Sequence, residues 1–84
     1  MSNKMNPSVR SVKPLANYKL HIEFTNGEHK IFDVSPFLEK GIFRELKDHQ
    51  YFQKVRVAFG AVEWPNEQDF SKDTLFKLGT SLSI

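Results

Sequence analysis

The sequence predicts a small single α+β domain in which antiparallel β-hairpins, about five strands in all, pack with two or three short helices. Two segments of alternating apolar and polar residues, each interrupted by a glycine turn, predict the hairpins. Serine, proline and glycine signals between and after them predict the helices. The chain has 84 residues, which is enough for one domain. We place that domain at residues 8–79, with a flexible N-terminal tail at 1–7 and a C-terminal tail at 80–84.

The clearest element is the hairpin from Tyr18 to Val34. Apolar residues alternate with polar ones up to Phe24, so Leu20 and its alternate neighbours share one face. Asn26-Gly27 then supplies the two positive-φ positions that a tight turn needs. A strand over residues 8–13 precedes the hairpin, and Pro14 either ends that strand or confines it to a sheet edge.

Two registers are open for this first hairpin. A two-residue turn pairs Ile22 with Ile31. A one-residue bulge beside the glycine instead pairs Ile22 with Phe32, and Leu20 with Val34. We favour the bulge because it keeps one face of the hairpin apolar.

Short helices are expected in the middle of the chain. Ser35-Pro36 is typical of a helix start, because serine caps free amides and proline suits the first helical position. Gly41 closes that helix in a left-handed conformation. A second short helix is expected from Phe43 to Lys47, with Leu46 on its apolar side.

The second hairpin is expected to turn at Phe59-Gly60. Val55, Val57 and Phe59 alternate with polar or small residues, and this turn places Val57 opposite Val62. The same pairing sets Val55 opposite Trp64 on one apolar face, and Pro65 ends the strand.

A last helix is expected from Lys72 to Leu78, with Ser71 as its cap and Gly79 as its stop. Asp73 in the first turn suits the helix dipole. Leu75 and Leu78 are expected to pack inward.

Composition excludes several classes of function. There is no cysteine, which rules out disulfides, thiolate chemistry and cysteine-ligated metals. No apolar run approaches the ~20 residues of a membrane span, and the first residues do not resemble a secretory signal. We therefore expect a cytoplasmic protein without a membrane partner. The net charge of +2 is too small to argue for nucleic-acid binding.

The reactive side chains do not form a recognisable catalytic or metal motif. His21, His29 and His49 are not at helical metal-ligand spacing, and in either register His21 and His29 differ in strand face or depth. Asp33 is interpreted as a residue that stabilises a turn or helix start. The glycines form no phosphate-binding loop. We predict no catalytic residue, no metal ligand and no cofactor.

A candidate interaction surface is more distinctive. Trp64 is favoured at binding hot spots, although it also suits the core of so small a domain. Lys54 and Arg56 alternate on an expected exposed strand face beside Tyr51 and Phe52, as in sheets that bind single strands. The candidate surface comprises Trp64, Pro65, Asn66, Asp69, Lys54 and Arg56.

Several short motifs across residues 9–78 resemble the bacterial domain of unknown function 2442, described as an NE-type N-terminal-domain-like fold. The motifs are Pro14-Leu15, Phe24-x-Asn26-Gly27-Glu28, Phe32-Asp33, Gly41-x-Phe43-x-x-Leu46, Val62-Glu63-Trp64-Pro65-Asn66 and Asp69-Phe70-Ser71-x-Asp73-Thr74-Leu75. The resemblance implies a small α+β domain. One departure is Glu67, where relatives often have glycine.

The resemblance also implies a partner. Such domains are often encoded beside a second small protein, which suggests toxin–antitoxin-like or regulatory pairing, and no catalytic residue is established for the family. We therefore expect a non-enzymatic interaction module that binds a small partner protein or a second copy of itself. The alternative is an accessory DNA-binding or transcriptional regulatory domain that uses Arg10, Lys13, Lys19, Lys54 and Arg56. A cofactor-assembly protein of the molybdopterin type, a label that some relatives bear, is the third hypothesis.

Overall fold

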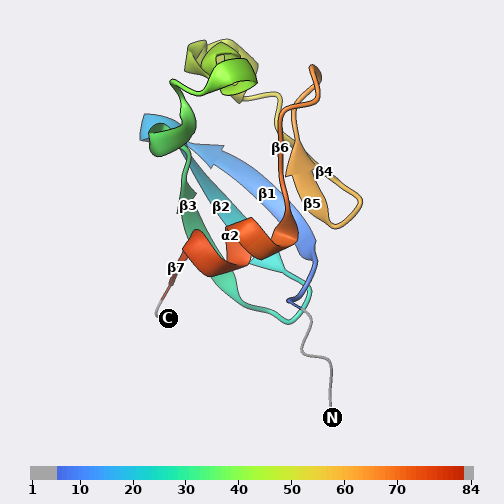
Figure 1. Cartoon of the computed structure of the whole chain (residues 1–84). Helices are drawn as coiled ribbons and strands as arrows, with labels where there is room; N and C mark the ends of the chain where they lie inside the picture. Colours follow the sequence, from blue (N-terminus) through green and yellow to red (C-terminus); the bar gives the residue numbers. More distant parts are fainter. Residues whose placement is uncertain (1–5, 83–84) are drawn as a thin grey trace.

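The computed structural model describes residues 6–82 (Figure 1). It confirms a small α+β domain, with seven strands where about five were expected. The strands are β1 (Val9–Leu15), β2 (Lys19–Phe24), β3 (His29–Asp33), β4 (Arg56–Ala58), β5 (Ala61–Glu63), β6 (Asp69–Phe70) and β7 (Thr80–Ser81). The helices are α1 (His49–Phe52), α2 (Lys72–Leu78) and the 3-10 helices η1 (Ala16–Tyr18), η2 (Ser35–Phe37) and η3 (Gly41–Lys47).

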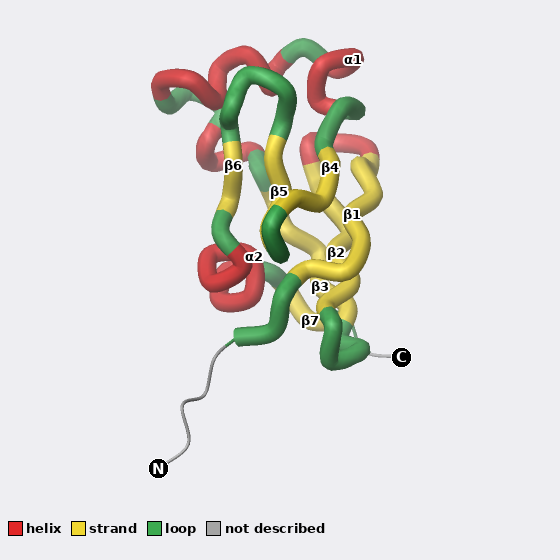
Figure 2. Tube along the Cα trace, turned by 90° about the vertical axis from the view of Figure 1, so that its right-hand side faces the viewer, coloured by secondary structure: helices red, strands yellow, loops and turns green. Residues whose placement is uncertain are grey.

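The strands form two antiparallel sheets. The larger sheet has the order β1-β2-β3-β7, and the smaller sheet has the order β4-β5-β6. Figure 2 shows β6 and α2 on one side of the larger sheet, and Figure 1 shows η2, η3 and α1 gathered at one end. None of the helices described is long and apolar enough to cross a membrane.

The hydrophobic core lies between the larger sheet, the smaller sheet and α2. Phe32 of β3 contacts Phe70 of β6 with ring centroids 4.9 Å apart, and Phe24 of β2 contacts Phe76 of α2 at 5.1 Å. The buried apolar residues are Val9, Leu20, Ile22, Phe24, Phe32, Val34, Leu38, Leu46, Phe52, Val62, Trp64, Phe70 and Leu75. Because these elements pack on one face of the larger sheet, the strand residues in between point to the other face.

The register of the first hairpin differs from both predicted registers. Leu20 pairs with Phe32, and Ile22 pairs with Lys30. Phe24 donates its N–H to the carbonyl of Glu28 and accepts from the N–H of Gly27, both at 2.9 Å. Gly27 has φ 89°. The loop therefore has three residues and ends in a left-handed glycine, which is the other common hairpin geometry.

This register places a lysine on the apolar face. Lys30 is only 8% exposed. Its ammonium donates to the carbonyl of Phe76 and lies 3.8 Å from the centroid of the Phe76 ring. The carbonyl and the cation–π contact offset the cost of burying the charge. The predicted register, which kept this face entirely apolar, was wrong because Phe76 of α2, 46 residues after Lys30, supplies a partner for the buried ammonium.

Strand β1 forms one edge of the larger sheet. Pro14 lies inside the strand, which confirms that proline confines it to an edge. The pairing with β2 shifts between Val9 and Ser11, so Arg10 lies in an irregular position. Val9 donates its N–H to the carbonyl of Gly60 at 2.9 Å, which ties β1 to the second hairpin.

The middle of the chain is helical, but its caps differ from the predicted ones. Asp33 accepts from the N–H of Ser35 at 2.9 Å, whereas the Ser35 side chain caps nothing. Gly41 has φ 48°, so its left-handed conformation is confirmed, but it begins η3 and does not close η2, which ends at Phe37. Helix α1 was not expected, and it buries Phe52 fully. Phe52 is therefore not available beside the basic residues Lys54 and Arg56 to bind a single strand, as the sequence analysis considered.

The second hairpin has the predicted register. Val57 pairs with Val62, and Ala58 pairs with Ala61. Phe59 and Gly60 have φ 52° and 76°, which are the two left-handed positions of a type I′ turn. Phe59 does not share the apolar face, because it occupies the turn itself.

The C-terminal segment is partly as predicted. Helix α2 begins at Lys72, and the Ser71 side chain accepts from the N–H of Thr74 at 3.2 Å. Leu75 is buried, but Leu78 is 61% exposed, so its predicted inward packing is wrong.

The predicted tails also need correction. Residues 80 and 81 are not tail, because they form β7 against β3. Leu82 also donates its N–H to the carbonyl of His29 at 3.0 Å. A Cβ on Gly79 would lie 2.6 Å from the carbonyl oxygen of Leu75, so the step from α2 into β7 requires glycine. Most of the predicted N-terminal tail, residues 1–5, lies outside the described residues. The side chain of Asn6 donates to Asp73 at 2.9 Å.

Candidate interaction surfaces

The face of the larger sheet that points away from the core carries a polar network. In the observed register, Glu23 pairs with His29 across the strands, and His21 pairs with Ile31. Residues of alternating position therefore share this face, which we call the open face. Its members are Ser11, Lys13, Lys19, His21, Glu23, His29, Ile31 and Asp33.

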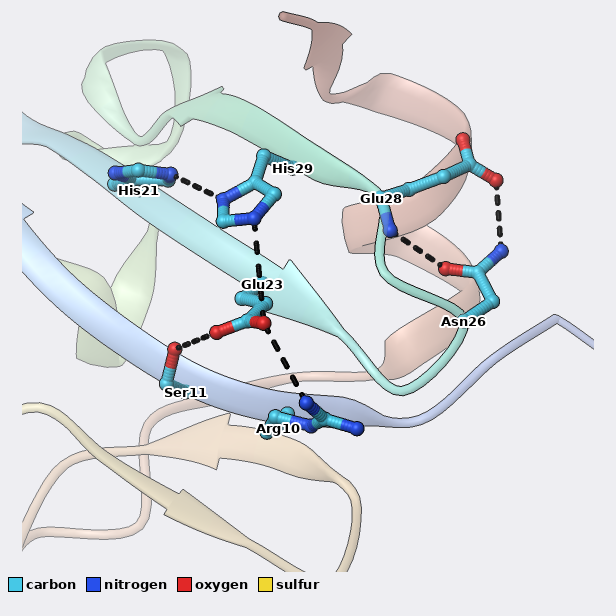
Figure 3. Close-up of polar contacts among 7 residues, drawn as sticks. All are labelled: Arg10, Ser11, His21, Glu23, Asn26, Glu28 and His29. Carbon is cyan, nitrogen blue, oxygen red and sulfur yellow. Dashed lines mark hydrogen bonds and ion pairs between the residues drawn. The ribbon is translucent and has the colours of Figure 1, made fainter.

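The two histidines of the open face contact each other. His21 Nε2 and His29 Nδ1 lie 2.9 Å apart (Figure 3). The prediction that they differ in strand face or depth is wrong, because both predicted registers of the hairpin were wrong. The contact is a diagonal one between neighbouring strands.

Glu23 links the histidines to β1. Its carboxylate accepts from the Ser11 hydroxyl at 3.3 Å and lies 3.6 Å from the Arg10 guanidinium. The same carboxylate is 4.0 Å from His29 Nε2. Figure 3 shows the resulting chain of side chains across three strands, from Arg10 through Glu23 and His29 to His21.

The network is half-buried rather than enclosed. The side chains of Glu23 and His29 are 29% and 30% exposed. In the hydrogen bond between the imidazoles, one ring nitrogen donates and the other accepts. No group of three or more histidine, aspartate or glutamate side chains in residues 6–82 is arranged to hold a metal ion.

The remaining bonds in Figure 3 stabilise the first turn. Asn26 donates to the Glu28 carboxylate at 2.7 Å and accepts from the Glu28 N–H at 3.0 Å. Asparagine commonly holds a turn by such a bond to the backbone two residues on. This pair therefore serves the fold.

Asp33, at the far end of the open face, also has a local role. The Ser35 hydroxyl, and then the Ser35 N–H, hold the pKa of the Asp33 carboxyl below its ordinary value. This is the helix-start role predicted from the sequence.

The candidate surface around Trp64 divides into buried and exposed residues. Trp64 is 1% exposed, and its indole N–H donates to the carbonyl of Phe52 at 2.9 Å. The core interpretation of Trp64 is therefore confirmed, and its ring is not part of an exposed surface. Pro65, Asn66 and Asp69 are exposed.

Exposed Asn66 is nevertheless engaged in the fold. Its amide donates to both oxygens of Glu45 at 2.9 and 2.8 Å, which ties the loop to η3. Its backbone N–H donates to the Tyr51 hydroxyl at 2.8 Å. Most of the polar groups of this loop hold two segments of the chain together.

Gln68, which the sequence did not single out, completes the connection. It is 1% exposed. It accepts from the Tyr51 hydroxyl at 2.7 Å and donates to the carbonyl of Ile42 at 2.9 Å and to Glu45 at 3.0 Å. These bonds satisfy the amide oxygen and nitrogen of Gln68, which are buried and cannot form hydrogen bonds with water.

The basic residues of the candidate surface are exposed. Arg56 donates to Glu63 through two nitrogens, at 3.0 and 2.6 Å, across the β4–β5 pair. Lys54 lies between α1 and β4. Strand β4, which carries Arg56, contacts β1, the strand that carries Arg10 and Lys13, although the two strands belong to different sheets.

The most exposed aromatic residue is Phe59, at 103% of its reference area. The sequence analysis placed the turn at Phe59-Gly60 but also counted Phe59 in the apolar alternation of the strand, so it did not predict that the ring would be exposed. A signal was present, because a type I′ turn favours asparagine at this position rather than phenylalanine.

A family model for a protein of unknown function, DUF2442, matches residues 9–81 of the chain. The chain belongs to this family. The match spans all seven strands and confirms the resemblance seen in the sequence. No curated protein and no solved structure matches the chain.

Glu67 stands where the resemblance described in the sequence analysis implies glycine. It has φ 73°, a left-handed conformation that glycine adopts readily. Its N–H donates to the carbonyl of Trp64 at 3.0 Å, so the turn after Trp-Pro-Asn forms despite the glutamate. A glycine at this position would adopt the same conformation without a Cβ.

Proposed function

We propose that this DUF2442 member is a non-enzymatic, cytoplasmic interaction module that binds a small partner protein in a toxin–antitoxin-like or regulatory pair. The observation that carries the proposal is the open face with its polar network. Donors and acceptors from three strands lie on this face, and the core-forming elements all pack on the opposite one.

The network is suited to recognition of another protein. Non-obligate protein interfaces are about as polar as the rest of a protein surface, with several direct hydrogen bonds. His29 contacts both His21 and Glu23, and Glu23 contacts Arg10, so these side chains hold one another in place before binding. Such pre-ordering reduces the side-chain entropy that is lost when a partner docks.

Co-expression tests the proposal. The chain is produced with the product of the gene beside its own, and the mixture is separated by size-exclusion chromatography. We expect one complex of defined stoichiometry. A free monomer beside a free neighbour, or a pair of identical chains alone, would refute pairing with this partner.

A matched pair of variants locates the contact. His29→Ala removes the central member of the network and is expected to weaken the complex at least about tenfold, which is ~1.4 kcal/mol. Lys77→Ala changes an exposed residue of α2, which lies on the core-facing side of the larger sheet, and is expected to leave affinity within about threefold. Equal effects of the two variants would place the contact elsewhere.

The alternative of an accessory DNA-binding domain is favoured by one observation. Lys13 and Lys19 share the open face. Arg10 and Arg56, however, lie against carboxylates at 3.6 and 2.6 Å, which weakens the cationic surface. A mobility-shift assay at low salt separates the two functions, since phosphate contacts give strongly salt-dependent binding.

A further inference from the structure

We propose that Phe59 is the apolar anchor of the module, and that its ring inserts into an apolar pocket on the partner protein. The inference rests on the proposed function and adds the contact residue and the kind of surface that the partner presents. Four features of the β4–β5 hairpin carry it.

The first feature is exposure. The Phe59 side chain is 103% exposed, whereas the next most exposed large apolar residues, Ile42 and Leu78, are 61% exposed. Its neighbours Ala58, Gly60 and Ala61 are small, so the ring projects beyond them. Aromatic side chains bury the most area on binding and dominate interface energetics.

The second feature is the backbone. Phe59 has φ 52°, which is unfavourable for a bulky residue, and the first position of a type I′ turn strongly favours asparagine. The turn explains the left-handed backbone but not the choice of phenylalanine, and residues that break local rules mark functional sites more often than others.

The third feature is the support beneath the ring. The carbonyl of Gly60 accepts from the N–H of Val9 at 2.9 Å. A Cβ on Gly60 would lie 2.9 Å from the Ser8 hydroxyl, so the chain before β1 packs directly on the turn. Arg56 and Glu63 join the base of the hairpin. A ring held on a fixed turn loses little entropy on binding.

The fourth feature is the shape and charge of the hairpin tip, which indicate what kind of partner binds Phe59. One ring buries about 150–250 Å², far below the ~800 Å² per partner of a stable interface, so two tips in contact do not make a dimer. A projecting ring needs a concave site. A membrane surface requires more apolar residues than one ring supplies. DNA would require free cations, but Arg56, in the same hairpin, is bound to Glu63.

The test measures binding of the purified neighbouring gene product to the chain by calorimetry. Phe59→Ala is expected to weaken binding at least about 30-fold, which is ~2 kcal/mol. Leu78→Ala, a matched loss of an exposed apolar side chain on α2, is expected to change affinity less than about threefold. If Phe59→Ala binds as tightly as the native chain, the anchor is wrong and the proposed function still stands.

A second variant separates binding from folding. Phe59→Asn is expected to bind as weakly as Phe59→Ala and yet unfold at a higher urea concentration, because asparagine suits the turn. A lower urea midpoint than that of the native chain would contradict the argument from the turn.

A crosslinking experiment does not depend on the neighbouring gene. A photoreactive phenylalanine analogue is placed at position 59, or at position 42 as the control, and the chain is irradiated in its own cells. A protein captured at 59 alone supports the anchor if its purified form loses affinity for Phe59→Ala. Capture of a second copy, or of nothing, overturns it. Phe59-dependent binding to vesicles of neutral and anionic phospholipid, or to duplex DNA, overturns it as well.

Discussion

The two ends of the β4–β5 hairpin contrast sharply, although Phe59 and Trp64 are only five residues apart. At the base, Trp64 is 1% exposed and hydrogen-bonded to the carbonyl of Phe52. At the tip, Phe59 is fully exposed. Both ends use a non-glycine residue in a left-handed conformation, Phe59 at the tip and Glu67 after the base.

The contrast teaches that aromatic content and alternation do not by themselves define a core. Trp64 follows β5 and packs against Phe52 of α1 and Phe70 of β6, whereas Phe59 lies in the turn at the other end of the hairpin. A phenylalanine at the base stabilises the fold. At the tip it contributes nothing to packing, so a different selective reason is needed for its presence there.

The largest expected effect is at the base. Trp64→Ala is predicted to lower the free energy of unfolding by about 3–5 kcal/mol, because it removes a buried ring and leaves a cavity. Phe59→Ala, at the tip, is predicted to change it by less than about 0.5 kcal/mol. Urea denaturation followed by circular dichroism measures both. Similar losses in the free energy of unfolding for the two variants would contradict the difference between the base and the tip of the hairpin.

The second effect concerns the polar bonds behind the base. Gln68→Leu is predicted to cost about 1–3 kcal/mol, because the Tyr51 hydroxyl and the Ile42 carbonyl lose a buried partner. Gln53→Leu, at an exposed position, serves as the control and is predicted to cost less than about 0.5 kcal/mol. Equal stability of the two variants would show that water replaces the lost bonds.

The third effect sharpens the comparison of the two left-handed residues. Glu67→Gly is predicted to stabilise the chain by roughly 0.5–1 kcal/mol, because glycine adopts φ 73° without a Cβ clash. Glu67→Ala keeps the Cβ and is predicted to give no gain. A gain from alanine equal to that from glycine would exclude the backbone as the cause.

The smallest expected effect concerns Asp33, which lies outside the β4–β5 hairpin and contributes a stability that depends on pH. The folded-state pKa of Asp33 is lowered, so its stabilising contribution is present above the unfolded value of about 3.9 and is lost as pH falls through the folded value. Asp33→Asn is predicted to cost a few tenths of a kcal/mol at neutral pH and nothing in strong acid. Urea midpoints across this range measure the difference, and a difference independent of pH would contradict it.

Local signals predicted most elements of the fold. Ser71 and Gly79 bound α2, Pro14 lies in an edge strand, and Phe59-Gly60 sets the register of the second hairpin, all as expected. Each depends on a property of one or two residues, namely capping, a missing N–H or a left-handed backbone.

The candidate site was predicted less well. The polar network of the open face went unrecognised, because the contact between His21 and His29 forms in a register that the sequence analysis did not consider. Asn66 was correctly placed on the surface, but its bonds to Glu45 are formed with a segment 21 residues away. No local pattern of residues reports such a contact.

The sequence by itself determined the class of fold, the capped helix, the second hairpin and the family. Only the tertiary structure decided the first register, because α2 supplies the carbonyl and the ring that make buried Lys30 acceptable. It also decided that Trp64 is covered and Phe59 is not. Burial depends on which distant segments pack over a residue, and that information is not present in the residue's own neighbourhood.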